Sequence, residues 1–174
     1  MCSSDLAKYR PHVSAYALPV QHLLSLREIE RERRRLLRDP EIRSIYEAAQ
    51  TVDIALVGIG MIAEQTPGFC SLAESYGVSV KRLRQLGVVG EINYQPFDAG
   101  GRIVDRPELR VLMHRILSVE GSRLQTLSRR PDRHVVAVAG GRAKLDAVRG
   151  ALAGRFMNAL VTDEDLAGAL VRRA

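Results

Sequence analysis

Three glycine-containing segments each follow a run of apolar residues and could hold a small polar ligand. They are Val57–Gly60, Gly87–Glu91 and Ala139–Lys144. Glycines at such points let backbone N–H groups approach an anion or a hydroxyl, and the third segment opens a predicted helix whose N-terminus favours negative charge. Lys144 adds a positive charge one turn further on. This chemistry suits a phosphate or a sugar oxygen, although glycine between a strand and a helix often serves only to turn the chain.

Glu91 is the most informative residue in these segments. A carboxylate inside a strand-like run, flanked by Gly90 and Ile92, is costly to bury without hydrogen-bond partners. The vicinal hydroxyls of a sugar are suitable donors to such a carboxylate. The alternative is an exposed strand end or a salt bridge, and the sequence leaves that alternative open.

Motifs for other chemistries are weak or absent in the sequence. Gly58 and Gly60 lack the third glycine of a dinucleotide fingerprint, and neither a GxSxG elbow nor a Walker A loop is found. Cys70 is interpreted as a buried, inert thiol. The histidines lack the spacing of zinc ligands, so each is interpreted as a surface or packing residue, and no metal or cofactor is expected. The four histidines are His12, His22, His114 and His134.

The elements that would position these segments alternate between helix and strand. Helices are expected at 26–38, 40–50, 80–86, 118–127, 142–153 and from 163, and strands at 53–60, 87–94, 135–139 and 159–162. Asp39 and Ser118 are the expected N-caps of two of these helices, and a hairpin-like turn is expected at 98–101. The continuous apolar run at 53–60 is typical of a strand buried on both faces.

This alternation predicts an α/β fold with a mostly parallel sheet and helices on both faces. In an open sheet of this kind, ligands bind beyond the carboxyl ends of the strands. The three glycine segments follow predicted strands or lie within one of them, so we expect them to meet at that edge.

The composition indicates one globular domain. The chain has 174 residues, of which 46% are hydrophobic and 26% charged, so it can bury a sizeable core. Its two cysteines cannot form a disulfide framework, which favours a reducing cytoplasm, and no apolar run approaches the length of about 18 residues that a membrane span needs. We therefore expect a cytoplasmic protein without a membrane partner.

The chain has a net charge of +6, and many of its charges lie in the segment 27–38, where six arginines stand against Glu28, Glu30 and Glu32. Such a run is typical of a solvated helix face, and Glu30 and Arg34 are spaced four apart, which supports a helix modestly. A partner surface is the alternative. DNA binding through phosphates alone is a third hypothesis, and it would be weak and steeply salt-dependent. The basic residues of the segment are Arg27, Arg31, Arg33, Arg34, Arg35 and Arg38.

The first residues are expected to be foreign. Residues 1–6, MCSSDL, are what one reading frame of a common sequencing adapter encodes. We therefore leave residues 1–6 out of the fold and interpret 7–174 as part of a domain whose natural chain continues upstream.

Taken in order, the glycine segments and their neighbours resemble the effector-binding domain of the SorC family of transcription regulators, also called the DeoR-type sugar-binding domain. The resemblance spans about residue 14 to the end of the chain. It is carried by ordered segments at natural spacing, which is more specific than any single glycine motif. The segments are 53–60, 87–92, Phe97-Asp98 with Gly101, 138–141 with Lys144, and 158–163 with Ala167.

The resemblance implies a fold similar to the isomerase and CoA-transferase-like α/β sheets. It also implies a small sugar, sugar-phosphate or polyol effector, no catalysis, and a homo-oligomer. Glu91 and Lys144 are the positions that would approach the effector, and four glycines would shape the surrounding loops. These glycines are Gly58, Gly60, Gly140 and Gly141.

The sequence departs from the family pattern in two respects. Family members begin with a helix-turn-helix domain, which contacts operator DNA, followed by a strand and a GG[TS]-type phosphate loop; neither is found here. The segment 93–97 also lacks the small residues of the common pattern, which favours a distinct class of effector. An alternative function is a sugar-phosphate isomerase with Glu91 as general base and Lys144 stabilising an enediolate, but the loops offer no second acid or base.

Overall fold

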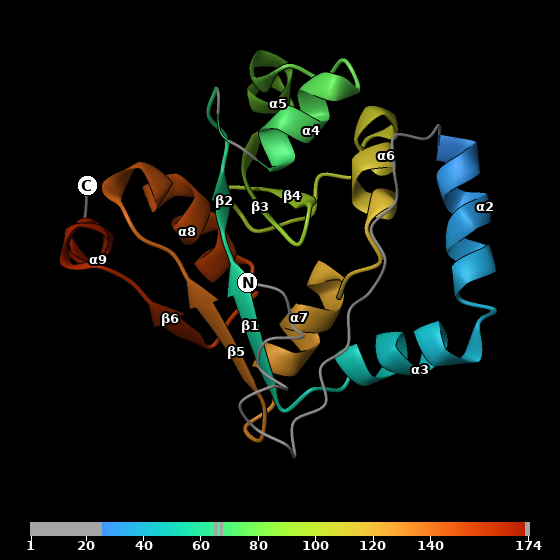
Figure 1. Cartoon of the computed structure of the whole chain (residues 1–174). Helices are drawn as coiled ribbons and strands as arrows, with labels where there is room; N and C mark the ends of the chain where they lie inside the picture. The colour runs from blue at the N-terminus through green and yellow to red at the C-terminus, as the bar shows by residue number, and fades with distance from the viewer. Residues whose placement is uncertain (1–25, 65, 67, 173–174) are drawn as a thin grey trace, which may run out of the picture.

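The computed structural model describes residues 26–64, 66 and 68–172 (Figure 1). In chain order the elements are α2 (Leu26–Leu36), α3 (Pro40–Ala49), β1 (Ile54–Gly58), β2 (Gly60–Met61), α4 (Phe69–Ser75), α5 (Val80–Gln85), β3 (Val88–Ile92), β4 (Gln95–Asp98), α6 (Pro107–Arg115), α7 (Gly121–Ser128), β5 (His134–Val138), the 3₁₀ turn η1 (Arg142–Lys144), α8 (Leu145–Ala153), β6 (Ala159–Val161) and α9 (Glu164–Val171). Residues 1–6, predicted to be foreign, and His12 and His22 lie outside the described residues.

The first two helices begin and end close to their predicted positions. The side chain of Asp39 accepts hydrogen bonds from the backbone N–H groups of Glu41 (2.9 Å) and Ile42 (3.3 Å), and Pro40 occupies the first turn of α3. These contacts confirm the predicted N-cap. Ile29 of α2 is fully buried, and α2 packs against α6. Together α2 and α3 lie along one side of the molecule, away from β6 and α9 (Figure 1).

The parallel sheet contains β1, β5 and β6, with β5 in the middle. Gly58 of β1 lies beside Val138 of β5, and Val138 lies beside Val161 of β6. All three strands therefore end at the same level, and the loops that follow them start side by side. This arrangement confirms the predicted α/β class with a parallel sheet.

One face of this sheet is exposed, which corrects the prediction that the first strand is buried on both faces. Side chains alternate along a strand, and Ala55 and Val57 pack with α7 and α8 on the covered face. On the opposite face, Ile54 is 65% exposed and Leu56 is 73% exposed. Val138 and Val161 extend this face across the sheet. The described residues cover β1 on one face only. Its apolar run in the sequence therefore did not reveal whether one face or both faces of the strand are covered.

The segment 87–94 does not continue the parallel sheet. β3 instead lies in a second, antiparallel sheet, between β2 and β4. A two-residue turn joins β3 to β4, because Asn93 (φ 50°) and Tyr94 (φ 63°) both adopt the left-handed conformation that such hairpins require. Asn93 and Tyr94 therefore form the turn and are not the end of the predicted strand.

A second turn lies tightly against α8. As predicted, the chain reverses at 98–101, where a carboxylate oxygen of Asp98 accepts hydrogen bonds from the backbone N–H groups of Gly100 and Arg102, both at 2.9 Å. Gly101 has a φ of +71°, and a Cβ atom there would overlap the backbone of Gly154, just after α8. The close approach of two backbones thus fixes this residue as glycine.

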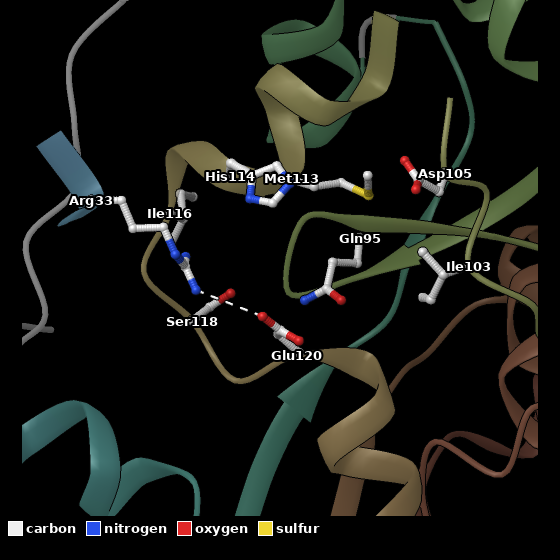
Figure 2. A pocket seen from close by; sticks show the side chains of 9 residues that line it. All are labelled: Arg33, Gln95, Ile103, Asp105, Met113, His114, Ile116, Ser118 and Glu120. Atoms are coloured by element: carbon white, nitrogen blue, oxygen red, sulfur yellow. Dashed lines mark ion pairs between the residues drawn. The ribbon is translucent and has the colours of Figure 1, made fainter. Parts of the chain in front are cut away.

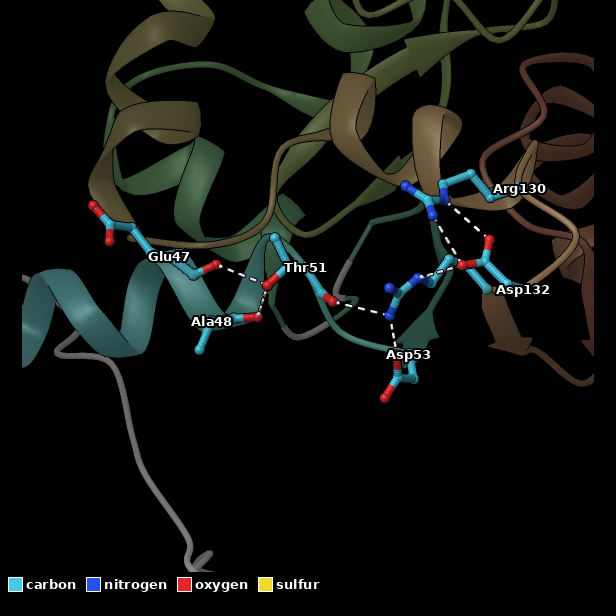
Figure 3. Close-up of polar contacts among 7 residues, drawn as sticks. Glu47, Ala48, Thr51, Asp53, Arg130 and Asp132 are labelled. Carbon is cyan, nitrogen blue, oxygen red and sulfur yellow. Dashed lines mark hydrogen bonds and ion pairs between the residues drawn. The ribbon is translucent and has the colours of Figure 1, made fainter.

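Polar contacts hold the start of β1 beside the start of β5 (Figure 3). The Thr51 hydroxyl donates to the carbonyl of Ala48 (3.2 Å) at the end of α3. The Arg133 guanidinium donates to the Thr51 carbonyl (3.2 Å) and forms ion pairs with Asp53 and Asp132. These contacts lie next to the first pair of the parallel register, in which Ile54 is beside His134.

Two helices and one cap differ from the sequence-based expectations. No helix was predicted at α4 or α6, which pack together around a separate apolar cluster. Ser118 is not an N-cap: α7 begins at Gly121 after Glu120, and the Ser118 hydroxyl donates to the carbonyl of Asn93 at 3.3 Å. Among the described residues, no helix combines the length and the apolar character needed to cross a membrane.

Candidate functional site

The candidate site forms where the chain leaves the parallel sheet and enters the antiparallel one. β1 ends at Gly58, and after Ile59 the chain continues as β2. Because β2 and β3 are antiparallel, Gly60 pairs directly with Glu91. This pairing carries Glu91 from a different sheet to the carboxyl edge of β1, which is where the sequence predicted a ligand site.

The Glu91 carboxylate is largely buried and is held by the chain around it. One of its oxygens accepts a hydrogen bond from the Tyr94 backbone N–H at 2.8 Å. Burial raises the pKa of Glu91, while this hydrogen bond and the charge of Lys144 act in the opposite direction. The site therefore contains a carboxylate that gains from any additional donor, such as a ligand hydroxyl.

Gly60 leaves the room that the Glu91 carboxylate occupies. A Cβ atom at Gly60 would overlap Glu91 Oε1, whereas a Cβ atom at Gly58 would have no neighbour within 4 Å. The two glycines thus differ in kind: Gly60 accommodates a functional side chain, and Gly58 borders open space.

We expect Gly60→Ala to displace the Glu91 carboxylate and to destabilise the protein by about 1–3 kcal/mol, the usual effect of overpacking. Gly58→Ala is the matched control and should change the free energy of unfolding by less than about 0.5 kcal/mol, as most substitutions in open space do. Urea unfolding of both variants measures the difference. Glu91→Ala in the Gly60→Ala background should recover part of the loss, because the overlapping atoms are gone; equal free energies for Gly60→Ala and Gly58→Ala would contradict this geometry.

Lys144 provides the positive charge of the site. Its ammonium group donates a hydrogen bond to the Ile59 carbonyl at 2.7 Å, which ties η1 to the end of β1. Lys144 attracts the Glu91 carboxylate electrostatically, but the two do not form a direct ion pair. A ligand oxygen could therefore contact both groups without first breaking a salt bridge.

An open hollow of about 290 Å³ lies over this edge. It is lined by Gly58, Ile59, Gly60, Glu91, Asn93 and Tyr94. The sequence reasoning missed Asn93 and Tyr94 as lining residues, because it placed both in a strand. The signal that could have found them is the asparagine, which tolerates positive φ and marks a two-residue turn.

Gly140 and Gly141 are not among the residues that line the hollow, and their loop is already occupied by a carboxylate. One oxygen of Asp163 accepts a hydrogen bond from the Gly141 backbone N–H, and the other accepts one from the Leu166 N–H at 2.8 Å. These two hydrogen bonds lower the pKa of Asp163. The N–H group that a phosphate would use at this loop is therefore bound to the protein's own anion, so the loop fits a neutral sugar oxygen better than a phosphate.

We expect Asp163→Ala to lower the melting temperature at neutral pH, because the α9 N-cap and the link to Gly141 are both lost. The lowered pKa of Asp163 means that this contribution is present above the unfolded-state pKa of 3.8 and is lost as the pH falls through the still lower folded value. Melting curves of wild type and variant should therefore converge in acid. Asp163→Asn, which keeps the capping oxygen, should lie between them. A variant as stable as wild type at neutral pH would count against the bridging role.

A second hollow, of about 190 Å³, lies away from the strand ends, between α2, α6 and the start of α7 (Figure 2). Arg33 of α2 points into it, forms an ion pair with Glu120 at 3.6 Å and donates to the Tyr46 hydroxyl at 3.1 Å. The buried Gln95 side chain accepts a hydrogen bond from the Gly121 N–H at 2.9 Å. The contacts of Arg33 thus connect α2 to α3 and to the start of α7. No residue of the predicted effector site lines this second hollow.

The remaining reactive side chains are not gathered into a site. Cys70 is 2% exposed, and burial raises the pKa of its thiol, which confirms the prediction of a buried, poorly reactive cysteine. His114 borders the second hollow and His134 is exposed at the start of β5. Within the described part of the chain, no group of three histidine, cysteine or acidic side chains could hold a metal ion.

Comparisons with known proteins identify the fold and the family of the chain. Residues 4–172 match a family model described as "Putative sugar-binding domain". The transcriptional regulator LsrR of Escherichia coli strain K12 is 33% identical over 132 residues, which are 75% of this chain and 39% of that regulator. The full-length sorbitol operon regulator SorC from Klebsiella pneumoniae superposes with a TM-score of 0.69 at 25% identity, covering 92% of this chain and 46% of that chain.

A DeoR family transcriptional regulator from Listeria monocytogenes has the same fold, with a TM-score of 0.71 at 23% identity over 97% of this chain and 62% of that one. The chain thus spans about 39% of the length of the regulator LsrR that it matches. The match to the family model covers nearly the whole chain. On this evidence, the chain belongs to the family of sugar-binding domains of SorC/DeoR-type transcriptional regulators.

Proposed function

We propose that this chain is the effector-sensing part of a bacterial transcription regulator, and that it binds a sugar, a sugar phosphate or a polyol at the edge of β1. The effector contacts Glu91 and Lys144, while Gly58, Gly60, Gly140 and Gly141 shape the surrounding loops. Binding alters the affinity of the full-length regulator for operator DNA, which is contacted by a helix-turn-helix domain elsewhere in that protein. The regulator acts inside the cell as a homo-oligomer.

The observation that carries this proposal is the largely buried Glu91 carboxylate, which lines an open hollow and is attracted by the charge of Lys144. Ligand hydroxyls supply the donors that Glu91 otherwise lacks, and Lys144 pairs with a partly negative oxygen of the same ligand. A charged acceptor and a charged donor suit the hydroxyl groups of a sugar or a polyol. The Asp163 carboxylate at the neighbouring loop adds a further acceptor for hydroxyl groups.

The site favours effector binding without turnover over the alternative function, isomerisation of a sugar phosphate. Proton transfer between adjacent carbons needs a base together with a group that protonates or polarises the carbonyl oxygen. Among the described residues, no histidine and no second carboxylate lines the hollow. The relatives in the comparison are named as regulators, which supports the same choice.

A thermal-shift screen of the 174-residue chain tests the proposal. The panel pairs free sugars and polyols with their phosphorylated forms, and nuclear magnetic resonance of the same mixtures detects isomerisation. A ligand at 100 times its dissociation constant stabilises the folded state by about 2.7 kcal/mol, which is a clear shift in melting temperature. We expect such a shift for at least one compound, its loss in Glu91→Gln, and no turnover.

Two results would overturn the proposal. One is isomerisation that Glu91→Gln abolishes, which would make Glu91 a catalytic base. The other is the lack of any shift by any compound at millimolar concentration. Leu152→Ser, an exposed substitution on α8, is the control and should keep the ligand-induced shift.

A further inference from the structure

The outer face of α2 carries a line of arginines that the effector site does not use. Arg27, Arg31, Arg34 and Arg38 follow one another at spacings of four, three and four residues. With about 100° per residue, all four lie within about 60° of one another on the helix. Arg38 follows the end of α2, where hydrogen bonds from Leu37 and Arg38 to the preceding turn continue the helical path. We call these four residues the arginine ridge.

The ridge lies opposite the side of α2 that packs on the protein. Ile29, which is fully buried, lies about half a turn away from the ridge, and α2 packs against α6. The four ridge arginines are exposed, and among residues 26–172 as described none of them forms an ion pair. The other two arginines of the segment are engaged: Arg33 with Glu120 in the second hollow (Figure 2), and Arg35 with Glu32.

Two of the acidic residues of α2 are drawn to arginines outside the ridge. Glu32 is the partner of Arg35, and Glu30 is attracted to Arg110 of α6. The expected support of Glu30 for Arg34 is therefore not realised as an ion pair. The four ridge arginines thus lie together on the solvent-exposed side of α2.

We propose that the arginine ridge binds the phosphate backbone of double-stranded DNA without reading its sequence. The ridge runs from Arg27 to Arg38, and eleven steps of about 1.5 Å make it about 16 Å long. One strand of B-DNA presents a phosphate about every 3.4 Å along that length. Guanidinium groups are the side chains best suited to phosphate oxygens. The ridge lies across the molecule from β6 and α9, so DNA on it leaves the edge of the parallel sheet free (Figure 1).

Other occupants fit the ridge less well. A membrane-surface helix needs an apolar face for the lipid, and the apolar face of α2 is already packed on α6. Single strands need stacking aromatic side chains, which are 5% of the chain and do not occur in α2. The alternative partner is an acidic protein surface, and the experiment below distinguishes it from DNA. The proposal rests on the proposed function, because DNA binding is relevant to a transcription regulator. The DNA-binding measurement itself does not require that function.

Fluorescence anisotropy of the 174-residue chain with two unrelated labelled duplexes, at 50 to 200 mM KCl, tests the proposal. Four neutralised phosphates predict a slope of about −3.6 in log K against log salt, which is a loss of about 100-fold over this range. Both duplexes should bind equally. The variant R27Q/R31Q/R34Q/R38Q should lose most of the affinity at 50 mM and should flatten the slope.

A matched variant, K81Q/R102Q/R106Q/R129Q, removes the same charge from exposed positions elsewhere and should bind nearly as well as wild type. An equal loss in both variants would show that net charge alone is at work and would overturn the proposal. No binding by wild type at 50 mM KCl, or tighter binding to an acidic peptide than to DNA, would overturn it as well. Ligand-induced thermal shifts of the ridge variant should equal those of wild type, so a failure here is distinct from a failure of the effector site.

Discussion

Gly101→Ala should lower the free energy of unfolding by about 2–5 kcal/mol, the largest loss that we expect of any of the single glycine substitutions in this chain. The residue has a φ of +71°, and a side chain in this conformation costs about 1–2 kcal/mol. The new Cβ atom would also overlap the backbone of Gly154 and lie 2.6 Å from the Gly150 carbonyl oxygen. Backbone cannot rotate away as a side chain can, so overpacking adds about 1–3 kcal/mol or more. Urea unfolding followed by circular dichroism measures the sum.

Gly87→Ala separates the two causes. Gly87 also has a positive φ, of +79°, but a Cβ atom there has no neighbour within 4 Å. Its substitution should therefore cost only the conformational part, about 1–2 kcal/mol. Since a domain of this kind is stable by about 5–15 kcal/mol, Gly87→Ala should fold normally. If the two variants lost equal stability, the close contact between the 98–101 turn and the end of α8 would not exist as described.

Glu91→Gln should abolish the ligand-induced thermal shift while making the free protein at least as stable as wild type at neutral pH. Glutamine has nearly the same shape, and its amide oxygen still accepts the hydrogen bond from Tyr94. It carries no charge, so the penalty of burying the ionised carboxylate disappears. A binding residue that reduces stability is expected where the ligand supplies the missing partners.

The difference in stability between wild type and Glu91→Gln should depend on pH in one direction. The pKa of Glu91 is raised in the folded protein, chiefly by burial, above the ordinary value of 4.5. Below pH 4.5, Glu91 is protonated in both states and resembles glutamine, so wild type and variant should melt together. As the pH rises through the folded pKa, wild type loses stability relative to the variant. Melting temperatures from about pH 4 to about pH 8 measure this divergence; a Glu91→Gln variant that is less stable at pH 7 than at pH 4, relative to wild type, would refute it.

The local features of the fold were predictable from short-range patterns. Asp39-Pro40 specified the start of α3, because a capping side chain and a fixed φ act within a few residues. The turn at 98–101 was equally local. The order of glycine segments also sufficed to indicate the family, since each marks a place where backbone must turn or approach closely.

Pairing between distant segments was not predictable. The expected strand at 87–94 had the right position but the wrong partner, because a strand pattern does not state which neighbour it will hydrogen-bond to or in which direction. The turn at Asn93 and Tyr94, the helix α6 and the true start of α7 after Glu120 all depend on contacts that the sequence does not express locally. The same holds for the exposed face of β1, since an apolar run does not reveal how many faces are covered.

The sequence by itself determined the α/β class, and it predicted Glu91 and Lys144 as the charged candidates for a ligand site at the edge of the sheet. Only the tertiary structure decided how they are used. Folding places Glu91 against Gly60 through an antiparallel pairing. Lys144 donates a hydrogen bond to the Ile59 carbonyl, and the Gly141 N–H donates one to Asp163. The physical reason is that residue type sets which interactions a group can make, whereas desolvation and hydrogen-bond competition depend on neighbours that are brought together only by folding.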